Sequence, residues 1–76
     1  MDSAIRMLVL ARIKAKEAFT QEDVLIDALN GDVRYFDNPR YVPVLVAVGH
    51  TSGTFVRQGQ LREERTGYGF SVYYVN

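Results

Sequence analysis

The chain has 76 residues, enough for one small domain with a modest hydrophobic core and too few for two. It contains no cysteine, so a disulfide framework and a thiolate metal site are both excluded. Nine basic and nine acidic residues give a net charge of zero, whereas a dedicated nucleic-acid binder is usually more basic. The charge is unevenly placed, because residues 1–16 carry +3, residues 17–37 carry −5 and residues 38–76 carry +2.

The N-terminal segment has an apolar middle, but an acidic residue precedes it and basic residues follow it. This order is the reverse of a secretory signal, and every apolar run is too short to span a bilayer. We therefore expect a cytoplasmic protein that makes no membrane contact.

The first expected element is an amphipathic helix from Ser3 to about Lys16. Proline and glycine are absent from this segment, and its apolar residues recur at spacings of three and four. Ser3 is the expected N-cap, and the basic residues near the C-terminal end suit the helix dipole. Met7 and Leu10 widen the apolar stripe, so we expect this helix to contact neighbours on two sides or a second chain.

The segment FTQEDVLIDALNG predicts a second helix over about residues 21–30. Thr20 and Asp23 have the spacing of a capping box, with Asp in place of the usual Glu. Phe19 and Val24 occupy the two positions of a hydrophobic staple. Gly31 then follows Asn30 as the expected left-handed stop of the helix.

The segment NPRYVPVLVAVGHTSG has two interpretations. A proline that follows asparagine is typical of a helix start, so we expect a short third helix over about residues 41–50, ended by Gly49 or Gly53. The valine-rich run from Val42 to Val48 is also typical of a buried strand, and short apolar runs are ambiguous. The strand therefore remains the alternative.

Two strands are expected in the last third of the chain. GTFVRQG predicts a short strand over about residues 54–58, and YGFSVYYVN predicts a strand over about residues 69–75. The polar segment QGQLREERTGY lies between them, so the two strands are expected to form a hairpin with a long tip.

The order of helix, capped helix, short third helix, strand, polar loop and strand resembles a winged helix-turn-helix domain. The resemblance covers nearly the whole chain, read as one domain over residues 1–76, and implies an α+β fold of three helices followed by a two-stranded β-hairpin wing. GHTSGTFVRQG is similar to the family's passage from the third helix to the first wing strand, and GYGFSVYYV is similar to its returning strand. In that family the third helix is usually the recognition helix.

The resemblance implies a small DNA-binding protein, and a transcriptional regulator in particular. The third helix would dock in or near the major groove of double-stranded DNA, and arginines of the wing and of the first helix would hold phosphates. Arginines of the wing can also enter the minor groove. The candidate DNA-binding residues are Arg40, Tyr41, His50, Thr51, Ser52, Arg57, Arg62 and Arg65. Glu63 and Glu64 lie among the hairpin arginines, so a solvated hairpin tip of mixed charge is the competing interpretation.

Catalytic and metal sites have no support in the sequence. His50 is the only histidine, and it lacks a partner at the spacing of a metal-binding pair. His50, Thr51 and Ser52 are adjacent, and adjacent residues in a turn do not give the geometry of a nucleophile and its base. We expect neither enzymatic activity nor a cofactor.

Two further partners remain open. Both faces of the last strand are partly apolar, with Tyr73 on one face and Tyr74 on the other, which indicates a homodimer. A winged-helix module that binds or inhibits another protein without contacting DNA is the alternative function. The zero net charge and the hydrophobic third helix favour that alternative.

Overall fold

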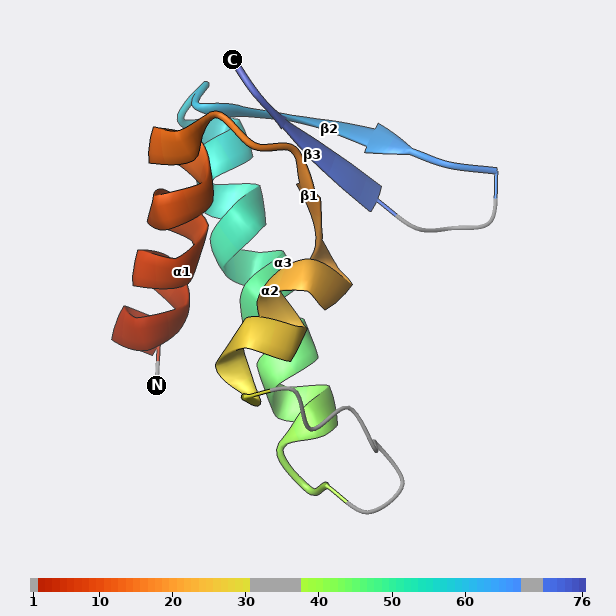
Figure 1. The fold of residues 1–76 in the computed structure, drawn as a ribbon. Coiled ribbons are helices and arrows are strands. Elements are labelled where there is room, and N and C mark those ends of the chain that lie inside the picture. The colour runs from red at the N-terminus through yellow and green to blue at the C-terminus, as the bar shows by residue number, and fades with distance from the viewer. Residues whose placement is uncertain (1, 31–37, 68–70) are drawn as a thin grey trace.

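The computed structural model describes residues 2–30, 38–67 and 71–76 of the chain (Figure 1). This part contains three helices and three strands in the order α1 (Asp2–Ala15), β1 (Phe19–Thr20), α2 (Gln21–Ala28), α3 (Tyr41–Arg57), β2 (Leu61–Arg65) and β3 (Ser71–Val75). The helices pack together, and β2 and β3 project from them as a hairpin (Figure 1). The prediction of a small α+β fold is confirmed.

α1 is an uninterrupted amphipathic helix, and one of its sides is buried. Ile5 and Val9 are buried one turn apart and contribute to the core. The helix already includes Asp2, so Ser3 lies inside it and is not its N-cap. Lys16 takes a left-handed conformation (φ 55°) directly after the last helical residue and ends the helix.

The capping box of α2 is confirmed. The Thr20 hydroxyl accepts a hydrogen bond from the Asp23 amide at 3.3 Å, and the Asp23 carboxylate accepts one from the Thr20 amide at 2.9 Å. The helix ends at Ala28, somewhat before the predicted residue 30. Asn30 itself takes the left-handed conformation (φ 55°), which asparagine tolerates better than most residues. The expected stop at Gly31 lies outside the described residues.

α3 is a helix and not a strand, and it continues seven residues beyond the predicted end at residue 50. The strand predicted over residues 54–58 is therefore wrong. Val44, Val48, Ser52 and Phe55 recur at spacings of four, four and three, so a continuous helix buries all of them on one side. Pro43 lies in the first turn, where its missing amide hydrogen removes no helical hydrogen bond.

The hairpin is formed from a different first strand than predicted. The segment expected to be its loop contains β2, whose five residues pair in antiparallel register with β3, from Leu61 opposite Val75 to Arg65 opposite Ser71. Gly59 (φ 81°) makes the turn between α3 and β2 with a conformation that favours glycine. Residues 69 and 70 of the predicted second strand lie outside the described residues.

β1 completes a three-stranded antiparallel sheet of order β1-β3-β2, which the sequence did not predict. Phe19 pairs with Tyr73, and their rings stack with centroids 5.3 Å apart. This contact anchors the base of the hairpin to the segment between α1 and α2.

The core lies between the three helices and the inner side of the sheet. Its buried residues are Ile5, Val9, Phe19, Val24, Leu25, Leu29, Val44, Val48, Phe55, Leu61 and Tyr73. Among the described residues, no helix combines the length and hydrophobicity needed to cross a bilayer.

Candidate functional site

The solvent side of α3 changes character along its length. Val42 and Val46 are 61% and 64% exposed one turn apart, so the N-terminal half presents an apolar surface. His50 and Arg57 are exposed on the C-terminal half. The helix therefore offers hydrocarbon at one end and cationic or hydrogen-bonding groups at the other.

The predicted residues of α3 do not all reach solvent. Arg40, directly before the helix, is exposed, and its amide donates to the Asn38 side chain at 2.9 Å. Tyr41 and Thr51 are half-buried. Ser52 is fully buried, which removes it from any surface site and contradicts its place among the predicted contacts. It lies on the core side of α3 because it is one turn beyond Val48.

A small cleft of about 160 Å³ lies between α1 and the C-terminal half of α3. It is lined by Arg6, Ala47, His50, Thr51, Thr54 and Phe55. The Arg6 guanidinium lies over the Phe55 ring, 5.6 Å from its centroid. The cleft thus joins a permanent cation of one helix to an imidazole and hydroxyls of another.

Arg57 is fixed beside this cleft by Thr54. Arg57 Nη2 donates to Thr54 Oγ1 at 3.1 Å, and that hydroxyl donates to the carbonyl of His50 at 3.1 Å. One hydroxyl therefore connects the side chain of Arg57 to the turn of α3 that carries His50. The sequence prediction named both of these residues individually, whereas Arg6 was covered only by the expectation that arginines of the first helix hold phosphates.

The arginines of the hairpin lie on a strand and not in a loop. Arg62 pairs with Glu64 at 3.3 Å and lies over the Tyr74 ring, 5.1 Å from its centroid. The guanidinium of Arg62 thus covers part of the apolar face that indicated a homodimer. Arg65 is exposed and takes part in none of the ion pairs between described residues, while Glu63 accepts a hydrogen bond from Ser71. The surface of β2 is therefore of mixed charge.

Arg12 has a structural role and joins α1 to α2. Its guanidinium donates to Asp27 at 2.9 Å and lies 3.6 Å from Glu17. The hydrogen bond to Asp27 raises the pKa of Arg12, and the charges of nearby carboxylates add to the effect. This arginine is consequently occupied within the fold.

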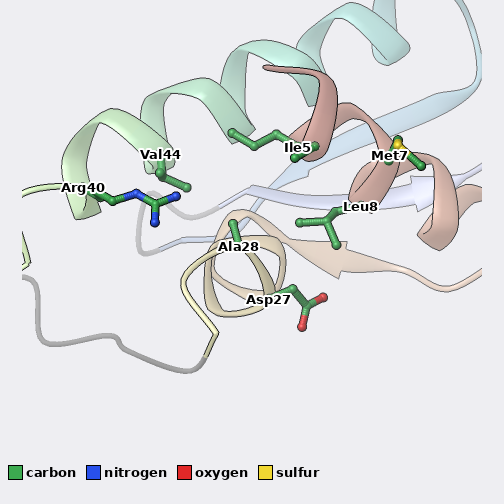
Figure 2. A pocket seen from close by; sticks show the side chains of 8 residues that line it. Ile5, Met7, Leu8, Asp27, Ala28, Arg40 and Val44 are labelled. Carbon is green, nitrogen blue, oxygen red and sulfur yellow. The ribbon is translucent and has the colours of Figure 1, made fainter. Parts of the chain in front are cut away.

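A larger cavity of about 590 Å³ lies where α1, α2 and the start of α3 meet (Figure 2). Most of its lining is apolar, including Ile5, Leu8 and Val44, and Arg40 and Asp27 supply charged groups at its margin. Because the Asp27 carboxylate already binds Arg12, Arg40 contributes the more available charge.

The residues that the structure describes include no group of three or more His, Asp or Glu side chains placed to hold a metal ion. Comparison of the chain with protein-family models, with curated proteins and with solved structures finds no match. The site is therefore interpreted from its own geometry.

Proposed function

We propose that the chain is a winged helix-turn-helix domain that binds double-stranded DNA and acts as a small transcriptional regulator in the cytoplasm. The order of the elements supports this proposal, because a hairpin follows the third helix and its returning strand packs back onto the domain. In such a domain α3 would lie in or near the major groove, and the β2–β3 hairpin would be the wing. A fold by itself does not establish a function, so the proposal depends on the exposed side chains.

The observation that carries the proposal is the set of basic side chains around the C-terminal half of α3. His50 and Arg57 are exposed there, and Arg6 reaches the same region from α1. Arginine and histidine donate to phosphate oxygens, which supply most of the affinity of a nonspecific complex. Arg65 would add a contact from the wing.

The N-terminal half of α3 would contribute little to base recognition through hydrogen bonds. Val42 and Val46 carry neither a donor nor an acceptor, and apolar side chains can contact only the methyl group of thymine in the major groove. We therefore expect binding governed by phosphate contacts, with a weak preference for sequence.

Fluorescence anisotropy with a labelled duplex at several salt concentrations tests the proposal. Affinity should be highest at low salt. A plot of log K against log salt should fall with rising salt, and each phosphate contact should make its slope steeper by about 0.9. Arg57→Ala and Arg65→Ala should each lower that slope by about 1, whereas Lys14→Ala should not, since Lys14 is exposed on α1 and lines neither cavity. Absence of binding at low salt would refute DNA binding.

The exposed valines favour a second candidate, a module that binds another protein or a second copy of this chain. Neighbouring apolar residues at such exposure are typical of contact surfaces, and the zero net charge fits this role. Sedimentation at rising protein concentration would test self-association. A dimer that Val46→Asp dissociates, in a chain that does not bind DNA, would favour this candidate.

A further inference from the structure

We propose that the cleft between α1 and α3 is a binding site for one phosphate group, held by Arg6, His50 and Arg57. The ligand class is a tetrahedral oxyanion, which either the backbone of a nucleic acid or a free phosphate can supply. The inference rests on the proposed DNA-binding function only where the backbone is the source.

The basic side chains come from two different helices, which distinguishes the cleft from a row of side chains on one helix. Arg6 projects from α1, and His50 lines the opposite side on α3. The Arg6 guanidinium lies over the Phe55 ring, 5.6 Å from its centroid, and this cation–π contact favours that position of the side chain. An arginine held in this way is suited to a bidentate contact with a phosphate.

Two threonine hydroxyls contribute to the cleft in different ways. Thr54 holds Arg57 at the margin through its 3.1 Å hydrogen bond, and Thr51 lines the cleft with a second hydroxyl. Arginine and hydroxyl donors are the side chains that usually bind phosphate oxygens. The cleft therefore has both the charge and the donors that an oxyanion requires.

The electrostatics and the volume of the cleft also suit a phosphate group. Among the described residues no carboxylate lines the cleft, and the ion pairs within that part of the chain involve Arg12 and Arg62 but not Arg6, His50 or Arg57. Its volume of about 160 Å³ equals roughly five water molecules at about 30 Å³ each, which is room for a phosphate group. An anion would thus enter without displacing a competing acidic side chain.

The test is an NMR titration of the full chain with inorganic phosphate, compared with sodium chloride at matched ionic strength. Phosphate should shift the signals of Arg6 Nε, His50 and Thr51 saturably, and chloride should not. Arg6→Gln keeps a polar, hydrogen-bonding side chain but loses the charge, and it should weaken phosphate binding about tenfold, as expected for one charge-assisted hydrogen bond. Lys14→Gln is the matched control on the same helix and should bind as the parent does.

A parallel titration with duplex DNA separates the two proposals. Saturable phosphate shifts without duplex binding would support the cleft as a site for a free phosphate and refute the DNA-binding function. Duplex binding that Arg6→Gln leaves unchanged, without phosphate shifts at the cleft, would refute the phosphate site and leave DNA binding intact. Circular dichroism of each variant establishes that it is folded before its affinity is compared.

Discussion

Replacement of Ser52 by alanine should make the protein more stable. Ser52 is fully buried, and its hydroxyl has no hydrogen-bond partner among the residues that the structure describes. A buried polar group without a partner costs about 1–3 kcal/mol. Alanine also has a helix propensity about 0.5 kcal/mol better than serine, and Ser52 lies inside α3.

Loss of the oxygen atom offsets part of this gain. Each contact of a removed atom is worth about 0.1–0.2 kcal/mol, so several contacts together amount to less than about 1 kcal/mol. The net expectation for Ser52→Ala is a rise of about 1–2 kcal/mol in the free energy of unfolding. For a domain of this size each kcal/mol should raise Tm by about 4–8 °C.

Urea unfolding followed by circular dichroism measures this change. The midpoint should rise while the slope of free energy against urea stays constant. Ser71→Ala is the control, because that hydroxyl donates to Glu63 on the surface of the sheet and its loss should not stabilise the protein. An unchanged or lower midpoint for Ser52→Ala would show that the buried hydroxyl is not a net cost, and the reasoning would fail.

Four further predictions concern the helices and the sheet. Thr20→Ala removes the capping box and should lower the free energy of unfolding by about 1 kcal/mol in the same assay. Gly53→Ala should raise it by about 1 kcal/mol, because a methyl group there meets only ordinary contacts. Gly49→Ala should raise it less, since its Cβ would lie 2.4 Å from Gln21 Nε2 and displace that group from the Leu45 carbonyl. Burial, with a smaller effect from the charge of Glu63, raises the pKa of Tyr73 above 10.0. The neutral phenol is therefore favoured in the folded state, and the associated stability should be complete below about pH 10 and lost as pH rises further. Unfolding free energies of the parent and of Tyr73→Phe at several alkaline pH values should diverge accordingly, and parallel curves would contradict the assignment.

The second helix was predictable because its signals are local. The hydroxyl of Thr20 and the carboxylate of Asp23 bond to backbone groups three residues apart, so sequence spacing alone specifies the contact. The α+β class was predictable for a related reason, since helical periodicity precedes a run of β-branched and aromatic residues.

The third helix shows where such signals fail. Gly49 and Gly53 indicated an end, and Phe55 with Val56 indicated a strand, yet all four residues lie in α3. The helical spacing from Val44 to Phe55 is present in the sequence, but a serine interrupts its apolar pattern. Burial of Phe55 against other elements outweighs the cost of two glycines, which local propensity does not reveal.

The residues of the candidate site also divide into those that the sequence indicated and those that only the packing of the helices decided. Arg40, His50, Arg57 and Arg65 were predicted from the sequence and are exposed in the structure, which makes them available to a partner. Ser52 was predicted with them and is buried, because the extended helix turns that position toward the core. Arginines of the first helix were expected to hold phosphates, but the place of Arg6 in this cleft was not predicted, since it is more than forty residues from the groups that it joins.

The sequence by itself determined the α+β composition, the start of α2 and the chemical types of the exposed basic residues. Each of these depends on composition or on contacts within one turn of the chain. The tertiary structure decided the length of α3, the pairing of β1 with β3 and the meeting of Arg6 with His50. A two-residue strand has no stability without its partner, and a cleft between helices exists only once their packing fixes which sides face each other.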